Sequence, residues 1–512
     1  MEKKVVLALD VGTTTIRCCL FNKDGELQGT CKDSVPILYP RPGYVEIDPE
    51  VLFNVVTSII STTLKKFNYS ADEVNCLGIA TLRGSFTTWS RKTGKPFHNI
   101  ITWKDLRAID VVQSLNCSFA LRALNVGSWV LHLLTRKNRF LGGRVLKFMN
   151  GQVAPRLLWA IKNIPQLSKA IEEEDALFGC VDTWLVYMLT NKGHYITDIS
   201  NISGTAIYDP YDQNYALKIM RLFGMPNNLK LPEIKPSRYD FGRTDKTYFG
   251  AMIPIASLVS DQGASIYGCG CSSKGTVRLT LGTGTFLSYN TLNLPHASIS
   301  GLYPTVAYQE SEKKVFVAEG SSTDTGPILD WCKCLGLFDD YKEITTIIQS
   351  VEDSDGVFFI PAFSGLQAPF HDDTAACGFI GLKPTTTKAH MLRAVVESFA
   401  FRVFQLWSIM LKETDSTTNV FRVDGGVSQC DFLLQLISDL CVVELECTSN
   451  PEMTALGAAQ LAALQTGFWT AEVCESQRKI NRIIKPRLEE KEKYIKQFRL
   501  WKTSVERLSS WY

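Results

Sequence analysis

The fold is decided by the stretch VVLALDVGTTTIRCCLF, residues 5–21. It begins with five apolar residues, 5–9, which form the short run expected of a buried strand. Asp10 follows at once, and a charge at this point indicates that the strand ends at a polar site. Residues 16–21 are again mostly apolar, so the stretch predicts two strands joined by a tight turn.

The turn between these strands carries groups that suit a phosphate. Gly12 lets the backbone bend, and three residues offer hydroxyls and backbone N–H groups: Thr13, Thr14 and Thr15. N–H groups gathered in a turn form a concave anion-binding nest, and Arg17 follows close enough to meet phosphate oxygens. Taken alone, the stretch is equally compatible with an ordinary glycine turn whose threonines face water.

Two later stretches favour the phosphate interpretation. Residues 276–289, TVRLTLGTGTFLSY, again predict a strand, a small-residue turn and a strand, with the turn formed by Gly282, Thr283, Gly284 and Thr285. Residues 421–426, FRVDGG, predict a strand that ends in Asp and in Gly425 and Gly426, which allow another backbone or a flat ring to approach closely. The sequence therefore predicts an internally duplicated protein with two phosphate loops facing a cleft.

The length of the chain agrees with a duplication. A chain of 512 residues is too long for one core and predicts two large domains. We place the boundary near residue 255, which gives an N-terminal domain at 1–255 with the first loop and a C-terminal domain at 256–512 with the second.

Composition excludes several classes of protein. The net charge of +2 gives no global field for nucleic acid or a membrane surface. The 15 cysteines are odd in number and include no C-x-x-C pair, so we expect reduced thiols in the cytoplasm and no disulfide framework or zinc site. The first apolar run is too short for a signal peptide, and no stretch reaches the ~18 apolar residues of a transmembrane helix.

Several further elements can be predicted locally. Asp48-Pro49 is a good start for a helix to about Lys66. A single helix is expected at 157–171, and a surface helix from Arg487 onward, with Trp501 and Trp511 packed against the body.

Asp261 follows another predicted strand, residues 253–259, and precedes a predicted helix at 264–269. A carboxylate at a strand end is well placed for acid–base chemistry. The alternative is that Asp261 only caps the helix that follows.

The segment 117–151 has a composition of its own. It contains six basic residues among aromatic and aliphatic ones: Arg122, Arg136, Lys137, Arg139, Arg144 and Lys147. We expect a solvated insertion packed on the N-terminal domain, and a docking surface for a protein or a membrane surface is the alternative.

The motifs together resemble the FGGY family of carbohydrate kinases, in particular its glycerol kinase-like members and a divergent animal subgroup of these. The resemblance covers nearly the whole chain. Besides the three motifs, it includes YPRPGYVEIDPE, FGCVDTWLVYMLT, SDQGASIYG, FSGLQAPF and MTALGAAQLAALQTGFW. It implies an α/β fold of duplicated actin/hexokinase-like (ribonuclease H-like) domains around a central cleft for ATP and substrate.

The resemblance also implies the activity, which is Mg²⁺- and ATP-dependent phosphorylation of glycerol. Asp261 would be the general base, Asp10 would hold the magnesium ion, and Arg17 would assist at the phosphates. The nucleotide would contact both loops (Gly12, Thr13, Thr14, Thr15, Gly282, Thr283, Gly284, Thr285) and Gly326, Gly425, Gly426 and Cys430. The substrate would contact Arg83, Gly84, Trp103, Asp261, Gln262 and Phe286.

Three positions depart from the family pattern. Gly84 replaces a glutamate that accepts hydrogen bonds from glycerol, a pocket tyrosine has no clear match near residue 150, and Cys430 replaces an asparagine on the adenine side. Polar contacts decide polyol specificity, so a kinase for another small polyol or sugar remains open. A weakly active ATP-binding regulatory protein also remains open, as does a homodimer.

Overall fold

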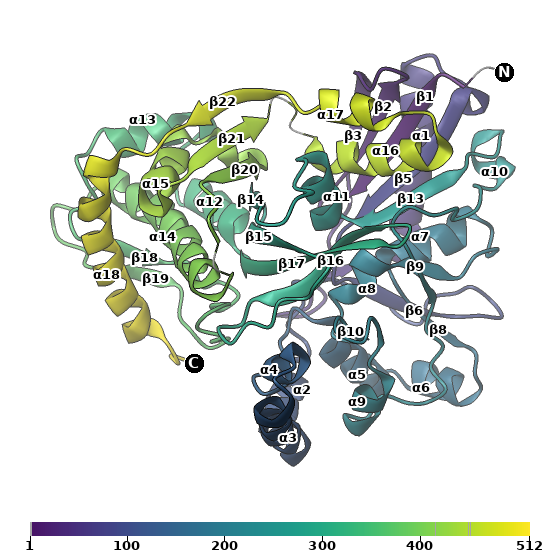
Figure 1. The fold of residues 1–512 in the computed structure, drawn as a ribbon, viewed down its shortest axis with the longest axis horizontal. Coiled ribbons are helices and arrows are strands. Elements are labelled where there is room, and N and C mark those ends of the chain that lie inside the picture. The colour runs from purple at the N-terminus through teal and green to yellow at the C-terminus, as the bar shows by residue number, and fades with distance from the viewer. Residues whose placement is uncertain (1–2, 415, 449, 451) are drawn as a thin grey trace.

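The computed structural model describes residues 3–414, 416–448, 450 and 452–512. Its elements form two α/β lobes, each built around one mixed sheet, with the N-terminus on one lobe and the C-terminus on the other (Figure 1). The predicted class of fold is therefore confirmed.

The first sheet contains the opening hairpin, as predicted. Strands β1 and β2 are antiparallel, and β1 and β13 both run parallel to β5. The order across the sheet is β13–β5–β1–β2–β3, with bounds β1 Val5–Val11, β2 Thr15–Asn22, β3 Leu27–Ser34, β5 Val74–Thr81 and β13 Ile255–Ser260.

The second sheet repeats this pattern and extends it at both edges. Strands β14 and β15 form the second hairpin, and β20 and β21 continue the sheet in parallel. The order is β16–β17–β15–β14–β20–β21–β22, with bounds β14 Val277–Leu281, β15 Thr285–Leu292, β16 Tyr303–Glu310, β17 Lys313–Ser322, β20 Val420–Asp424, β21 Glu444–Thr448 and β22 Ile480–Ile484.

The two sheets share one five-strand plan. In each, an antiparallel three-strand unit is followed by two parallel strands, so β3–β2–β1–β5–β13 corresponds to β17–β15–β14–β20–β21. The division predicted near residue 255 falls at the start of β13, which pairs with the first sheet, and the second sheet begins at β14.

In the described part of the chain, the remaining strands form one four-stranded sheet and three two-stranded sheets, and the helices pack around them and around the two main sheets. The smaller strands are β4 Glu46–Ile47, β6 Phe86–Ser90, β7 Ile100–Ile101, β8 Ala176–Cys180, β9 Ile196–Asp198, β10 Tyr208–Asp209, β11 Asn214–Tyr215, β12 Glu233–Lys235, β18 Phe358–Ile360 and β19 Gly378–Ile380. The helices are α1 Pro49–Lys66, α2 Ile109–Cys117, α3 Phe119–Thr135, α4 Asn138–Gly143, α5 Val153–Asn163, α6 Pro165–Glu172, α7 Val181–Leu189, α8 Ile199–Ser203, α9 Leu217–Leu222, α10 Lys246–Phe249, α11 Asp261–Gly268, α12 Thr325–Cys334, α13 Ile344–Gln349, α14 Lys388–Thr414, α15 Asp431–Cys441, α16 Met453–Thr466, α17 Ala471–Ser476 and α18 Lys491–Leu508.

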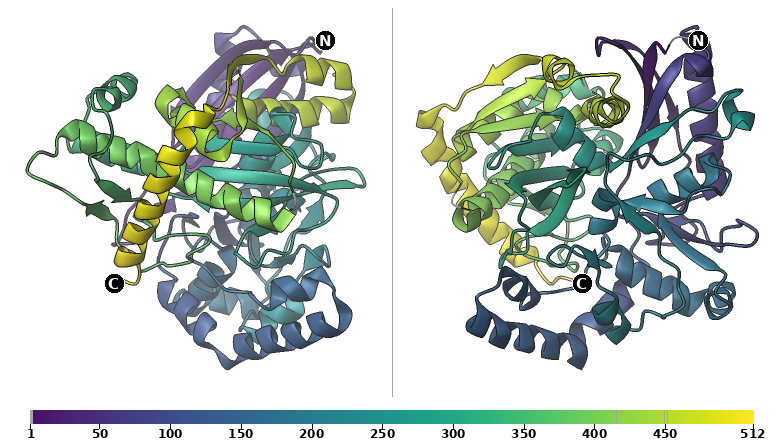
Figure 2. Two further views of the ribbon diagram at one scale, coloured as in Figure 1. Left: turned by 60° about the vertical axis from the view of Figure 1, so that its left-hand side comes forward. Right: turned by 45° about the vertical axis from the view of Figure 1, so that its right-hand side comes forward.

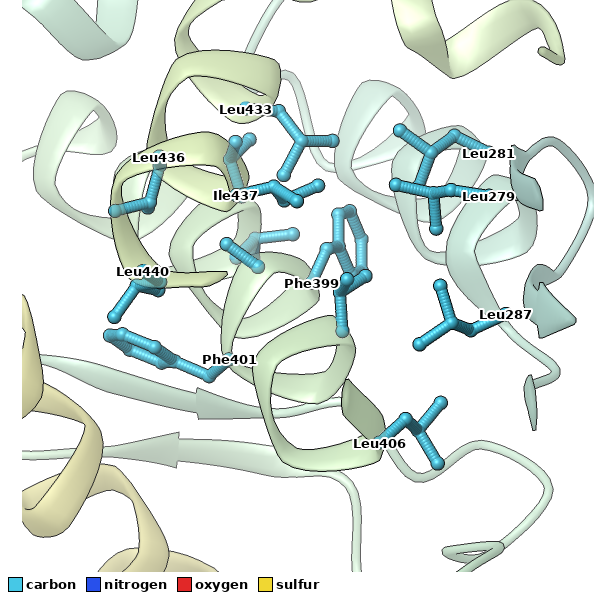
Figure 3. Close-up of a cluster of buried hydrophobic side chains, with 14 of the residues drawn as sticks. Leu279, Leu281, Leu287, Phe399, Phe401, Leu406, Leu433, Leu436, Ile437 and Leu440 are labelled. Carbon is cyan, nitrogen blue, oxygen red and sulfur yellow. The ribbon is translucent and has the colours of Figure 1, made fainter. Parts of the chain in front are cut away.

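Helix α14 is the centre of the second core. Figure 3 shows Phe399 and Leu406 of this helix beside Leu287 of the sheet, with Ile437 of α15 packed close by. By length and composition α14 is apolar enough to cross a membrane. However, 78% of its most apolar 18-residue stretch is buried inside the protein. Its hydrophobicity is thus accounted for by the core that it fills.

Helix α16 follows the second sheet in the chain but packs on the first. It lies against β5, β1 and β13, and it crosses α11 at very short range (Figures 1 and 2). A Cβ atom added at Gly457 would lie 1.8 Å from the Ala264 carbonyl oxygen, and one at Gly78 would lie 2.2 Å from that of Ala458. Only glycine permits these backbones to approach so closely.

Two local predictions are wrong. The helix expected at 157–171 is two helices, α5 and α6, because Pro165 cannot continue α5 and instead begins α6. Of the two tryptophans expected to pack on the body, Trp501 is fully buried, but Trp511 is 63% exposed because it lies beyond the end of α18.

The tight crossing of α16 and α11 leads to a stability prediction. We expect Gly457→Ala to destabilise the protein by about 1–3 kcal/mol, because the added methyl group overlaps the Ala264 carbonyl. The matched control is Gly127→Ala in α3, where a Cβ meets nothing within 4 Å and where alanine favours the helix by up to ~1 kcal/mol. Thermal unfolding of both variants tests this, and an unchanged Tm for Gly457→Ala would contradict it.

Candidate active site

A cleft of about 2410 Å³ separates the two lobes. It is lined from the first lobe by residues at the carboxyl ends of β1, β5 and β13, and from the second lobe by the turns after β14 and β20. Ligands of open α/β sheets bind at such carboxyl ends. The cleft is therefore the candidate active site.

The first loop is closed by its own backbone. The Gly12 N–H donates to the Thr15 carbonyl at 3.1 Å, and the Trp103 indole N–H donates to the Thr13 hydroxyl at 3.0 Å. Arg17 lies between two carboxylates, 3.4 Å from Asp10 and 3.3 Å from Glu452. The loop thus brings a carboxylate, a cation and hydroxyl groups to one wall of the cleft.

Asp10 is only 7% exposed at the end of β1. Burial raises the pKa of its carboxyl to about 7, Arg17 opposes this rise, and the nearby negative charges of Asp261 and Glu452 add to it. A carboxyl group whose pKa is raised toward neutral pH in this way is typical of functional sites.

Asp261 does not cap its helix. The cap of α11 is Ser260, whose hydroxyl accepts from the Gly263 N–H at 3.1 Å, so the cap interpretation of Asp261 is wrong. Asp261 is instead the first residue of α11 and lines the cleft. Burial raises the pKa of its carboxyl, while Arg83, the Gln262 N–H and Arg278 lower it.

The residue after Asp261 joins the two lobes. The Gln262 side-chain oxygen accepts from Arg278 at 2.8 Å, and Arg278 also pairs with Asp424 at 3.0 Å. Asp424 accepts from the Thr280 hydroxyl at 2.7 Å as well. The carboxylate of the DGG motif is therefore fully engaged inside the protein.

The second loop resembles the first. The Gly282 N–H donates to the Gly284 carbonyl at 3.1 Å, and the Gly326 N–H donates to the Thr283 carbonyl at 3.0 Å. A Cβ at Gly326 would lie 3.1 Å from the Thr283 Cα atom, which explains the glycine there.

The paired glycines serve different purposes. Gly425 has φ +94° and lies so close to the Leu281 carbonyl that a Cβ would be 2.3 Å from its oxygen. A Cβ at Gly426 would meet nothing within 4 Å, and this residue lines the cleft, as does Cys430, whose sulfur lies 3.7 Å from the Thr345 hydroxyl. The cleft is thus open beside Gly426.

The first-lobe end of the cleft is built around Arg83 and Gly84. Arg83 forms an ion pair with the buried Glu319 of β17 and donates to the Thr305 hydroxyl at 3.4 Å. Gly84 has φ +72°, and its carbonyl accepts from the buried Arg156 at 2.7 Å. Since a side chain at this φ is strained, the backbone here is adapted to glycine.

The structure brings most of the predicted site residues together. Those that line the cleft are Asp10, Gly12, Thr13, Thr14, Arg17, Arg83, Gly84, Trp103, Asp261, Gln262, Gly282, Thr283, Gly284, Phe286, Gly326, Gly425, Gly426 and Cys430. Two others are not among the residues that line it. The Thr285 hydroxyl is buried against that of Thr325 at 2.7 Å, and Thr15 lies in β2.

Sequence reasoning missed several polar residues at the cleft. Glu319, Arg278 and Glu452 hold Arg83, Gln262 and Arg17 in place, and Lys104 lies 5.2 Å from the Trp103 ring. Burial lowers the pKa of Lys104. Glu319 and Arg278 each interrupt an apolar strand sequence, VFVAEG and TVRLTL, and this signal could have identified them.

The cleft suits a divalent cation that is bound jointly by the protein and by substrate phosphates. Among the described residues, no group of three or more His, Cys, Asp or Glu side chains could hold a metal. Mg²⁺ is commonly bound by one or two carboxylates together with substrate phosphates and water. Asp10 beside the first loop offers one such carboxylate.

Comparison with known proteins identifies the class of protein. Models of the FGGY family of carbohydrate kinases match this chain, the N-terminal domain at residues 5–268 and the C-terminal domain at 277–466. The chain belongs to the FGGY family of carbohydrate kinases and is a kinase.

Particular relatives place the chain within this family. It is 43% identical to "Glycerol kinase 5" of Danio rerio over 464 residues, which cover 91% of this chain and 88% of the relative. The corresponding Bos taurus protein is 40% identical over 508 residues, 99% and 96% of the two chains. The crystal structure of Plasmodium falciparum glycerol kinase with ADP superposes with a TM-score of 0.84 at 27% identity, covering 99% of both chains.

The buried Asp10 carboxylate leads to a second stability prediction. Its raised pKa means that ionised Asp10 destabilises the native state once the pH exceeds the unfolded value of 3.8, and most fully above about 7. We expect Asp10→Asn to raise Tm by roughly 1–4 °C at pH 8 and by less at pH 5.

The control is Asp33→Asn, which alters an exposed carboxylate of β3 and should leave Tm unchanged. A lower Tm for Asp10→Asn at pH 8 would show that the carboxylate stabilises this site instead.

Proposed function

We propose that this kinase transfers the γ-phosphoryl group of ATP to a hydroxyl of glycerol and forms glycerol 3-phosphate. The observation that carries the proposal is that Asp10 and Asp261 lie at one edge of the first sheet and line the same cleft as both phosphate-type loops. Carbohydrate kinases of this family use ATP.

Asp261 is the proposed general base. Burial raises its pKa above that of an ordinary aspartate, which makes the carboxylate a stronger base toward a hydroxyl proton. The proton of the attacking hydroxyl moves to the Asp261 carboxylate as the oxygen attacks the γ-phosphorus and the bond to the β-phosphate oxygen breaks.

The two loops position the phosphates. In this proposal the first loop (Gly12 to Thr15) and the second loop (Gly282 to Thr285) provide N–H and hydroxyl donors, and Arg17 contributes positive charge. Thr285 would act through its backbone, since its hydroxyl is engaged by Thr325. Asp10 would hold Mg²⁺, which neutralises phosphate charge when bound.

In this proposal the nucleotide base binds to the second lobe. The open space beside Gly426 supports adenosine binding along Gly425, Gly426 and Cys430, with Gly326 near the phosphates. Domain closure over this site would exclude water and limit wasteful ATP hydrolysis.

Glycerol is supported by relatives and by the site. Both relatives named above are called glycerol kinase 5, and the superposed structure is a glycerol kinase. Glu319 lies beside Arg83 and so offers a carboxylate where Gly84 provides none. We propose that the polyol is surrounded by Glu319, Arg83, Trp103, Gln262 and Phe286. We also propose that the kinase works in the cytoplasm.

One observation favours a second candidate, a kinase for another small polyol or sugar. Gly84 has a backbone conformation that disfavours any side chain, and Arg156 fixes its carbonyl. Position 84 therefore offers no free acceptor for a glycerol hydroxyl. This favours a polyol or sugar that does not need an acceptor at this point of the cleft.

A substrate panel tests the function. We expect ADP release from Mg-ATP to depend on glycerol more strongly than on other small polyols and sugars. Asp261→Asn should lower kcat by roughly 10²–10⁴-fold because the base is lost, while ATP affinity measured by calorimetry stays within a few-fold. Asp33→Asn is the matched control with full activity.

Other results would revise the proposal in defined ways. Turnover with another polyol alone would preserve the mechanism and change the substrate. ATP binding without turnover of any substrate would contradict the proposed enzymatic activity and would favour a regulatory ATP-binding protein.

The pH profile tests the base separately. Burial raises the pKa of Asp261, so log kcat/KM for glycerol at saturating Mg-ATP should fall on the acid side of the profile as this carboxylate becomes protonated. Asp261→Asn should remove this acid limb from the residual activity. A residual activity of Asp261→Asn with the same acid limb as the wild type would contradict Asp261 as the base.

A further inference from the structure

Helix α3 presents an unpartnered apolar face to solvent. Phe119 is 85% exposed, Leu134 76% and Val126 60%, and Trp129, Val130, Leu131 and Leu133 are each 42–47% exposed. Residues 119, 126, 130, 133 and 134 follow helical spacing and so share one side of α3. Figures 1 and 2 place α3 at the periphery of the protein, far from both main sheets.

The opposite face of α3 already has its partners. Leu121 packs with Phe148 and Phe223 in a small core, and Leu124 and Ser128 line the cleft. The outer side chains are therefore not needed to attach the helix to the lobe. A continuous exposed apolar surface of this kind marks an interaction site.

The charged side chains of the segment that carries this face have one sign. Segment 117–151 contains six Lys and Arg residues and no Asp or Glu. Among the described residues, Arg122, Arg136, Lys137 and Arg144 are exposed and form no ion pair, and Arg122 lies near one end of α3 with Arg136 and Lys137 at the other. An anionic partner would complement this arrangement.

The basic residues around α3 argue against a second copy of the chain as the partner of this face and favour an anionic lipid surface. A second copy of the chain docked by the same face would place basic residues against basic residues, because an isologous contact is self-complementary and the segment carries no acid. An anionic lipid surface provides both an apolar layer and negative charge. Basic amphipathic helices with Trp, Phe and Leu on the apolar side bind in the plane of such a surface.

The packing of this helix opposes a spanning mode. Helices α2 and α3 together are long and apolar enough to cross a membrane, but they are bent by 52° at their junction. Both are also packed on the lobe, α2 against α5 and α3 through Leu121, which contacts Phe223. The apolar face can therefore lie on a bilayer but cannot cross one in this fold.

We propose that the outer face of α3 docks this kinase on an anionic lipid bilayer. The apolar side chains from Phe119 to Leu134 enter the headgroup layer, and the basic residues at both ends of the helix contact lipid phosphates and carboxylates. The docking face and the cleft lie on opposite sides of one helix, so docking leaves the catalytic groups free. Docking by this face is independent of which polyol the kinase phosphorylates.

Vesicle flotation of the full chain tests the proposal. We expect flotation with vesicles of phosphatidylcholine containing about one third phosphatidylserine, at least about tenfold weaker binding to phosphatidylcholine alone, and weaker binding at high salt. The double variant Val130→Glu/Leu134→Glu should lower binding at least about tenfold. Arg136→Gln/Lys137→Gln should lower it chiefly at low salt.

Matched controls separate docking from general surface effects. Leu500→Glu on α18 replaces a leucine that is 57% exposed far from α3, and Lys65→Gln/Lys66→Gln removes two exposed charges from α1. Both variants should bind vesicles like the wild type. Because the α3 substitutions lie outside the cleft, Tm and kinase turnover in solution should also stay unchanged.

Three results would overturn the proposal. The first is no flotation of the wild type with either vesicle, and the second is undiminished flotation of Val130→Glu/Leu134→Glu. The third is a concentration-dependent dimer in sedimentation velocity that this double variant dissociates, which would make a second copy of the chain the occupant.

Discussion

The parallel register of β1, β5 and β13 is the constraint on which the site depends. Val11 of β1 and Ser260 of β13 both pair with Thr81 of β5, so the three strands end at the same level. Whatever follows each strand must then emerge at one edge of the sheet. This register places Asp10, Arg83 and Asp261 on one wall of the cleft although they are far apart in the sequence.

The same edge requires charges to be buried, and ion pairs and hydrogen bonds compensate them. Across the cleft, Arg83 of the first lobe pairs with Glu319 of the second, and Gln262 accepts from Arg278. Within the first lobe, Arg17 lies between Asp10 and Glu452. Truncating one member of such a pair leaves a buried charge without its partner. These contacts therefore connect the relative position of the lobes to the protonation of the carboxylates.

Much of this arrangement could be predicted from the sequence, and the reasons are local. Strand–turn–strand patterns around Asp10 and Gly282 are short-range signals, and the structure contains both hairpins. The role of Ser260 as cap of α11 was missed because Ser and Asp are adjacent and both are good caps. Only the three-dimensional structure shows which of the two turns toward the helix.

Contacts between residues far apart in the sequence could not be predicted in this way. Glu319, Arg278 and Glu452 act on residues that are tens to hundreds of positions distant, and no spacing rule links them. The backbone of Gly84 is a similar case, since its φ and its bond to Arg156 depend on the packing of α5. Which side chains of α3 are exposed is likewise visible only in the structure.

A structure of the complex with Mg²⁺, a non-hydrolysable ATP analogue and glycerol would test the central claim most directly. We predict that the γ-phosphate lies between the Gly12–Thr15 and Gly282–Thr285 turns and that a glycerol hydroxyl lies within about 2.6–3.2 Å of an Asp261 carboxylate oxygen. A triphosphate bound away from either turn, or a glycerol hydroxyl that cannot reach Asp261, would contradict it.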